Sequence, residues 1–150
     1  MSAWTKADPR FRAAVSSELE SLLGAPSLPV VALISGGLDS MLLAEALQAH
    51  GYPVHVLHVN YGLRGADSDG DEALVREWAE RAGCPIQVVT APVNFGDAPD
   101  LQARARALRY DAAAQWASEL GSNLVATAHH ADDAIETFLL FAARGTGIDG

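Results

Sequence analysis

The sequence predicts an α/β domain built on a parallel sheet with helices on both faces. Short runs of consecutive apolar residues, rich in Val and Ile, alternate along the chain with longer segments of helical character. Consecutive apolar positions are typical of strands that are buried on both faces of a sheet. Strands separated by helices require crossover connections, and such connections place neighbouring strands parallel.

Residues 1–28 are predicted to form an N-terminal helical extension of this domain. Apolar residues recur at helical spacing over 11–23, and Gly24 then ends the helix. The domain itself begins with a strand at 29–34, rich in Val and Ile, which a helix at 38–50 follows.

The alternation continues through the middle of the chain. A strand is expected at 54–59, and a polar, glycine-rich loop over 60–70 separates it from a helix at about 71–82. Gly83 and Pro85 end that helix, and the next strand is expected at 86–90.

The last part repeats the pattern once more. After a loop, an alanine-rich helix is expected over 101–120, with Gly121 at its end. A fourth strand is expected at 124–128 and a final helix at 132–143.

Composition excludes several classes of protein. The 150 residues are 49% hydrophobic and 19% charged, which suits one compact domain. The net charge of −9 excludes a strongly basic module that coats nucleic acid. The chain contains no apolar segment long enough to span a bilayer and no apolar signal core at its N-terminus, so we expect a cytoplasmic protein without a membrane partner. With Cys84 as the single cysteine, an internal disulfide is excluded.

Polar residues follow three of the predicted strands, at 35–40, 60–70 and 129–136. In parallel α/β sheets, ligands bind beyond the carboxyl ends of the strands. Because these three segments meet at that edge, we expect them to form one site.

The strongest chemical signal follows the first strand and reads Ser35-Gly36-Gly37-Leu38-Asp39-Ser40. The two glycines permit a tight turn that brings backbone N–H groups close to an anion, while the serines add donors. The helix that follows contributes the positive end of its dipole. The segment therefore predicts a phosphate-binding loop. It is not the lysine-containing P-loop, because Lys6 is the only lysine in the chain.

Asp39 requires a further explanation, because a carboxylate beside bound phosphates repels them. A divalent cation between the two removes that repulsion, so Asp39 predicts a Mg²⁺ ion that bridges the carboxylate to a nucleotide. The alternative is an ordinary helix start, with Asp39 or Ser40 as a capping residue.

The loop sequence SGGxDS resembles that of the PP-loop family, ATP-dependent enzymes that adenylate a substrate and release pyrophosphate. Further blocks in the same order resemble those of one branch, the tRNA(Ile)-lysidine synthases. These blocks are His58–Gly65 with Ser68 and Asp71, Ala105–Tyr110, His129–Asp133 with Glu136 and Thr137, and Arg144–Gly147 with Gly150. The resemblance implies a Rossmann-like fold of the adenine nucleotide alpha hydrolase type. It also implies that residues 29–150 form a PP-loop ATP-binding domain that is incomplete at its C-terminus.

The resemblance implies a ligase that uses ATP and Mg²⁺ and acts on tRNA(Ile) with a CAU anticodon. ATP adenylates the wobble cytidine and pyrophosphate is released. The amine of free L-lysine then displaces AMP, which leaves lysidine. Such enzymes carry further tRNA-binding domains, so the activity of this chain alone is left open, as is a homodimer.

The resemblance also suggests roles for individual residues, which physical chemistry permits. Asp39, Arg109, Asp133 and Glu136 are the predicted catalytic residues. Arg109 stabilises charge, whereas Asp133 and Glu136 share a helix face and bind lysine or accept its proton. His129 either approaches the phosphates or is structural. The predicted nucleotide-binding residues are Ser35, Gly36, Gly37, Leu38, Asp39 and Ser40 for the phosphates and Mg²⁺, His58, Val59 and Asn60 for adenine through their backbone groups, and His129.

Three alternatives stay open. The chain could be another PP-loop enzyme, either an amide-forming synthetase or a tRNA-thiolating enzyme, although the lone Cys84 argues against thiolation. It could be a metal-dependent hydrolase with ligands between His129 and Glu136. It could also be an ATP-binding fragment without catalytic activity. Tyr61 stands where the resembling family commonly has histidine, so it is assigned no catalytic role.

Overall fold

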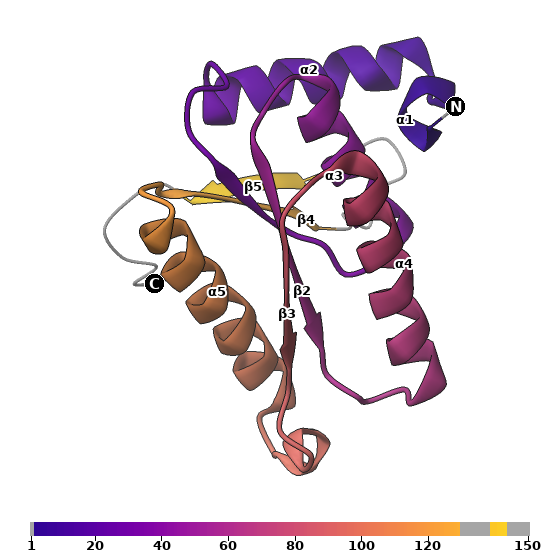
Figure 1. Cartoon of the computed structure of the whole chain (residues 1–150), viewed down its shortest axis with the longest axis vertical. Coiled ribbons are helices and arrows are strands. Elements are labelled where there is room, and N and C mark those ends of the chain that lie inside the picture. The colour runs from indigo at the N-terminus through magenta and orange to yellow at the C-terminus, as the bar shows by residue number, and fades with distance from the viewer. Residues whose placement is uncertain (1, 130–138, 144–150) are drawn as a thin grey trace.

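The computed structural model of the chain describes residues 2–129 and 139–143 (Figure 1). Within them a five-stranded sheet has the strand order β3-β2-β1-β4-β5. The strands are β1 (Val30–Leu33), β2 (Val54–Asn60), β3 (Ile86–Thr90), β4 (Leu124–His129) and β5 (Leu139–Ala143). The helices are α1 (Ala3–Lys6), α2 (Pro9–Leu23), α3 (Leu38–Ala49), α4 (Ala66–Ala82), α5 (Leu101–Glu119) and the short 3₁₀ helix η1 (Phe95–Asp97).

The first four strands are parallel, as the sequence predicts. Val30 of β1 pairs with Val54 of β2 on one side and with Leu124 of β4 on the other. Strand β3 pairs in parallel with the outer edge of β2. The central strand β1 is therefore paired on both edges. Its side chains are buried without alternation because a core covers each face of the sheet, with Val30 and Ala32 in one core and Val31 and Leu33 in the other.

The predicted helix at 132–143 is wrong over its last five residues, which form strand β5. This strand pairs antiparallel with β4, with Ala143 opposite Val125. A short apolar run has no decisive periodicity, and the open edge of β4 offers its backbone groups hydrogen-bond partners. Residues 132–138 of the predicted helix lie outside the described residues.

The helix expected at 71–82 begins earlier, at Ala66, so the second half of the predicted loop is helical. Gly65, with a φ of +53°, turns the chain into the helix. Asp67 and Asp69 lie in the first turn, where carboxylates interact favourably with the helix dipole. The early start brings the N-terminal end of α4 beside the glycine loop.

Helices cover both faces of the sheet (Figure 1). On one face, α3 and α4 pack with α2 in a core that contains Leu43, Leu47 and Val75. On the other face, α5 packs Tyr110 and Trp116 against the sheet. The N-terminal helices belong to the first of these cores, because Trp4 of α1 is buried beside Phe11 and His50. The described helices include none with the length and apolar character needed to span a membrane.

Candidate functional site

The glycine loop lies at the carboxyl end of β1 and leads directly into α3. Gly36 has a φ of +95°, a left-handed conformation that side chains rarely adopt. A Cβ at this position would lie 3.0 Å from Asp71 Cβ in the second turn of α4. Glycine is therefore required at position 36 by the backbone conformation and by the close approach of α4.

The loop is held in shape by Ser40, which is 5% exposed. Its Oγ accepts hydrogen bonds from the N–H groups of Ser35 and Gly36, each at 3.2 Å, and donates to the carbonyl of Gly37 at 2.9 Å. The N–H group of Gly37 donates to Ser35 Oγ at 3.3 Å. Serine hydroxyls thus accept all three N–H groups, two of them at Ser40 Oγ and one at Ser35 Oγ, and a bound phosphate oxygen would replace these acceptors.

Gly37 is the N-cap residue of helix α3, and Ser40 contacts the backbone just before it. Helix α3 begins after Gly37 without a side-chain capping hydrogen bond, and the Ser40 hydroxyl is used within the loop. Leu38 is 70% exposed, so it contributes backbone rather than core packing. Asp39 lies in the first turn of α3, the position from which a carboxylate can reach a cation bound at the loop.

A cavity of about 240 Å³ opens beside the loop on the α5 side of the sheet. We call it the α5-side cavity. It lies at the carboxyl ends of β1 and β4. The chain passes from β1 outward to β2 and β3 on one side and then crosses from β3 to β4 on the other side of β1, and such a switch point is where α/β sheets bind ligands. The lining of the cavity includes Ser35, Ser40, Val59, Tyr61, Arg109 and Thr127.

Three residues of β2 are predicted to offer backbone groups to adenine. The backbone N–H and carbonyl of Val59 point to the opposite edge of the strand from those of the other two. The carbonyl of Leu57 accepts from the N–H of Ile34, so the backbone of Leu57 faces β1. Backbone groups alternate along a strand, and those of Val59 therefore also face that side, beyond the last paired residue of β1. The backbone groups of His58 and Asn60 face β3 instead.

Arg109 reaches the α5-side cavity from α5, held by Tyr61. Its Nη1 donates to Tyr61 Oη at 3.4 Å, and Tyr61 Oη donates to the carbonyl of Ala105 at 3.3 Å. The Tyr61 ring stacks on Phe95 at a centroid distance of 5.6 Å. Burial raises the pKa of Tyr61, although the Arg109 charge opposes this shift, so the phenol stays protonated at neutral pH. Tyr61 was assigned no catalytic role from the sequence, and its contact with Arg109 arises only in the fold.

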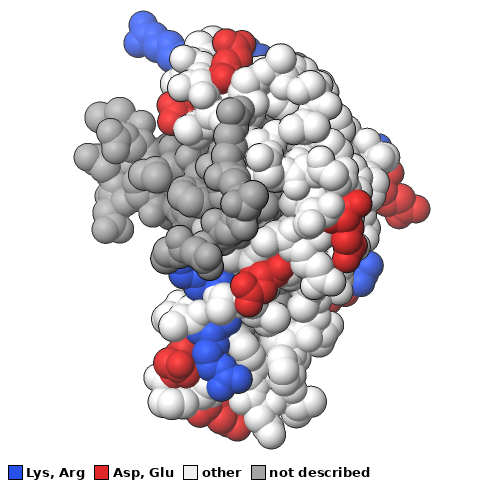
Figure 2. Space-filling view, turned by 90° about the vertical axis from the view of Figure 1, so that its left-hand side faces the viewer, with Lys and Arg blue, Asp and Glu red and all other residues white. Residues whose placement is uncertain are grey.

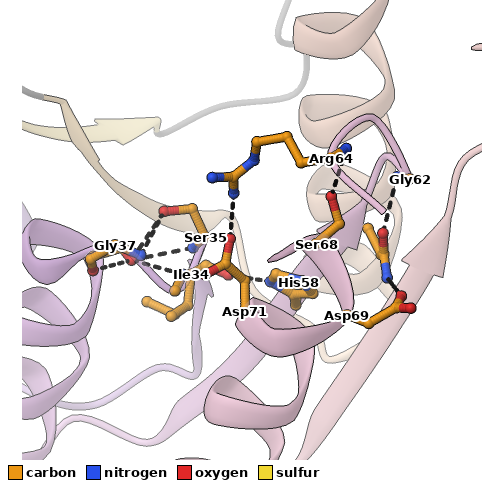
Figure 3. A network of polar contacts seen from close by, with 12 residues as sticks. Ile34, Ser35, Gly37, His58, Gly62, Arg64, Ser68, Asp69 and Asp71 are labelled. Carbon is orange, nitrogen blue, oxygen red and sulfur yellow. Dashed lines mark hydrogen bonds and ion pairs between the residues drawn. The ribbon is translucent and has the colours of Figure 1, made fainter. Parts of the chain in front are cut away.

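A second cavity, of about 260 Å³, lies on the α4 side of the loop. We call it the α4-side cavity. Arg64 and Asp71 form an ion pair at its margin (Figure 3). His58 lines it from β2 and is 2% exposed, with Nδ1 2.7 Å from the carbonyl oxygen of Ile34. Ser35, Val59 and Tyr61 line both cavities, so the two adjoin.

The side chain of Asn60 holds the chain segment after β2 in place. Its Nδ2 donates to Glu72 Oε2 at 2.8 Å and to Asp69 Oδ1 at 3.1 Å, while its Oδ1 accepts from the N–H of Gly62 at 2.9 Å. The hydrogen bond from Asn60, followed by that from Arg76, lowers the pKa of Glu72. The Asn60 side chain is therefore structural.

The structure brings part of the predicted site together. Ser35, Ser40, Val59 and Arg109 line one cavity, and Asp39 lies on the adjoining turn of α3. His129 ends β4, while its side chain and the whole of Asp133 and Glu136 lie outside the described residues. The predicted hydrolase cluster falls there too. Arg64 and Asp71 were assigned no role from the sequence, although both belong to the family-like block that begins at His58.

A Mg²⁺ ion fits the donors at the loop, because carboxylate and phosphate oxygens are its preferred ligands. In the described part of the chain, no three His, Cys, Asp or Glu side chains gather as a metal site by themselves. An ion beside Asp39 would therefore take its remaining ligands from a bound nucleotide and from water.

The fold and the loop define an α/β domain of the type that binds nucleotides at its switch point. The sequence matches the PP-loop domain family over residues 12–150. The chain belongs to the PP-loop domain family.

Curated relatives named tRNA(Ile)-lysidine synthase are similar over most of this chain. Those from Parabacteroides distasonis, Bacteroides thetaiotaomicron and Zymomonas mobilis are 40%, 34% and 37% identical over 81%, 83% and 78% of it. The matched regions make up only 28%, 30% and 35% of those relatives. The chain thus corresponds to about a third of their length.

Solved structures share the fold. The NH3-dependent NAD synthetase from Campylobacter jejuni superposes with a TM-score of 0.56 at 14% identity, over 83% of this chain and 56% of that one. The NMN synthetase from Francisella tularensis gives a TM-score of 0.56 at 17% identity, over 87% and 57% of the two chains. At such identities the likeness concerns the fold alone.

Proposed function

We propose that this chain is the ATP-binding domain of a tRNA(Ile)-lysidine synthase. The observation that carries the proposal is the position of the glycine loop, which lies at the switch point and contributes Ser35 and Ser40 to the lining of the α5-side cavity. Arg109 supplies a cation on the far side of that cavity. The similarity to curated synthases supports the choice of reaction.

ATP would bind with its triphosphate on the loop and its adenine in the α5-side cavity. The backbone of Val59 faces that cavity and offers an N–H and a carbonyl to the edge of the base. Leu33 and Leu57 provide an apolar wall, as is usual for nucleotide pockets. Mg²⁺ at Asp39 would neutralise phosphate charge when bound.

The reaction would proceed in two steps. The ring carbonyl oxygen of the wobble cytidine attacks the α-phosphorus of ATP, and the bond to pyrophosphate breaks. The amine of lysine then attacks the ring carbon, and AMP leaves with the former carbonyl oxygen as the amine loses a proton. Arg109 would stabilise negative charge that develops around the α-phosphorus.

Lysine would be bound by Asp133 and Glu136, whose carboxylates complement its ammonium groups, and His129 would approach the phosphates. Glu136→Gln in the synthase should therefore raise the KM for lysine more than the KM for ATP. The tRNA would be held largely by other parts of the protein. On the α5 side, the described residues show cationic and acidic atoms interspersed (Figure 2).

The test is release of pyrophosphate from ATP with Mg²⁺, tRNA(Ile) and lysine, measured for this chain and for a longer protein that contains it. Pyrophosphate release that requires the tRNA supports the proposal. ATP binding without release from either protein favours an ATP-binding fragment. Tight zinc or manganese binding without ATP favours the hydrolase, and release with a different acceptor indicates another PP-loop enzyme. A cytoplasmic location and a homodimer remain predictions.

A further inference from the structure

The side chain of His58 joins β2 to the end of β1 at the point where the glycine loop begins. His58 is 2% exposed, and its Nδ1 lies 2.7 Å from the carbonyl oxygen of Ile34. A carbonyl oxygen can only accept, so Nδ1 carries the proton and donates it. Figure 3 shows His58 and Ile34 together with Ser35, the first residue of the loop. The ATP site described above gives this hydrogen bond no part.

The hydrogen bond from His58 takes the place of the next one in the sheet. Where β1 and β2 run in parallel, the N–H of Ile34 donates to the carbonyl of Leu57 at 2.9 Å. The regular pattern would continue with the N–H of Val59 donating to the carbonyl of Ile34. That bond is not formed among the described residues, and the carbonyl accepts from His58 instead. The N–H of Val59, which lines the α5-side cavity, is therefore left for a ligand.

The same hydrogen bond sets the direction of the first N–H group of the loop. The carbonyl of Ile34 and the N–H of Ser35 belong to one planar trans peptide group, so they point in opposite directions. With the carbonyl held by His58, the N–H points to Ser40 Oγ at 3.2 Å. This N–H is one of those that a phosphate oxygen would take over. His58 thus controls a phosphate donor without lying beside the phosphate.

We infer that His58 is a positioning residue for ATP. By holding the carbonyl of Ile34, it directs the N–H of Ser35 to the phosphates and leaves the N–H of Val59 free for the adenine base. This inference rests on the proposed function and deepens it. The other ring nitrogen, Nε2, is buried and has no hydrogen-bond partner among residues 2–129 and 139–143. The effect therefore comes from Nδ1 alone.

A side chain with a donor in the place of Nδ1 should be sufficient. In His58→Asn, the amide Nδ2 is joined to Cβ through one carbon, as Nδ1 is in histidine, and it donates. His58→Leu and His58→Phe fill the site without a donor. The control is His55→Leu, which changes another histidine of β2. His55 contacts Trp116 at a centroid distance of 5.4 Å and lines neither cavity.

The first experiment measures amide hydrogen exchange of the full chain without nucleotide. In His58→Leu, the Ser35 amide should exchange faster, because its peptide group is no longer held. The Val59 amide should exchange more slowly, because the released carbonyl can now accept from it. His58→Asn and His55→Leu should leave both amides as in the wild type. A merely structural role of His58 would accelerate both amides or neither, and either result would overturn the inference.

The second experiment measures binding of α,β-methylene-ATP with Mg²⁺ by calorimetry, and urea denaturation reports the stability of each variant separately. His58→Leu and His58→Phe should weaken binding about tenfold, the effect of losing one or two oriented donors. His58→Asn should restore binding, and His55→Leu should keep it. If the wild type binds no nucleotide, the proposed function fails. If the wild type and His58→Leu bind equally well, this inference alone fails.

Discussion

Asp71, in the second turn of α4, lies against Gly36 of the glycine loop so closely that no side chain fits between them. A Cβ on Gly36 would meet the Asp71 Cβ at 3.0 Å and its backbone Cα at 3.3 Å. The contact joins the loop after β1 to the helix after β2. It also places the Arg64–Asp71 ion pair beside the phosphate-binding loop.

Gly36→Ala should lower the free energy of unfolding by about 1–3 kcal/mol, because alanine is strained at a positive φ and contacts α4. Gly37→Ala is the matched control. Gly37 has a φ of −70°, and its added Cβ would lie 3.5 Å from Ser35 Oγ, an ordinary contact. Urea denaturation measures both variants. Equal losses would show that the contact with Asp71 does not matter.

Ser40→Ala should destabilise the loop, because the N–H groups of Ser35 and Gly36 lose their shared acceptor. We expect a loss of about 1–3 kcal/mol in the free energy of unfolding. The two amides should also exchange faster with solvent, as measured by hydrogen exchange. Unchanged exchange at Ser35 and Gly36 would contradict the hydrogen bonds of the loop.

Asp39→Asn should preserve the fold and reduce pyrophosphate release by on the order of 100-fold or more, because the cation loses its anionic ligand. The wild-type rate should rise with Mg²⁺ concentration, and the variant should need more Mg²⁺ to reach half its maximum. An unchanged rate at every Mg²⁺ concentration would remove Asp39 from the mechanism.

Tyr61→Phe keeps the ring that stacks on Phe95 but removes the hydroxyl that contacts Arg109. The kcat of pyrophosphate release should fall about three- to tenfold, the effect of one hydrogen bond. The free energy of unfolding should change little. In an Arg109→Gln background the same substitution should have almost no further effect, because the two residues act together. A loss of equal size in both backgrounds would show that Tyr61 does not act through Arg109.

The lowered pKa of Glu72 predicts how the free energy of unfolding depends on pH. Its folded-state pKa is lowered, mainly by the hydrogen bond from Asn60, so its contribution is present above the unfolded pKa and is lost as the pH falls through the folded pKa. Glu72→Gln should therefore destabilise the protein at neutral pH, and the difference from wild type should shrink in acid. Glu80→Gln on the same helix provides the comparison. A constant difference between neutral and acidic pH would contradict the prediction.

Much of the architecture could be predicted from local patterns. The parallel strands β1 to β4 and the position of the glycine loop follow from consecutive apolar residues, helical periodicity and glycines, all of which act within a few residues. The same patterns misjudged the start of α4 and the segment 139–143. Acidic residues such as Asp67 suit a loop as well as a first helical turn, and the five-residue apolar run of β5 suits either kind of element.

The candidate site likewise combines features that local sequence patterns predict with features that they do not. Which groups could bind phosphate was predictable, because the two glycines and two serines of the loop lie within six consecutive residues and their chemistry does not depend on distant residues. Three relationships could be seen only in the folded chain: Tyr61 contacts Arg109, Asp71 packs against Gly36, and His58 has a buried ring nitrogen without a hydrogen-bond partner among the described residues. These relationships join segments that are far apart in the chain. They arise from the packing of α4 and α5 on opposite faces of one sheet, which no local pattern specifies.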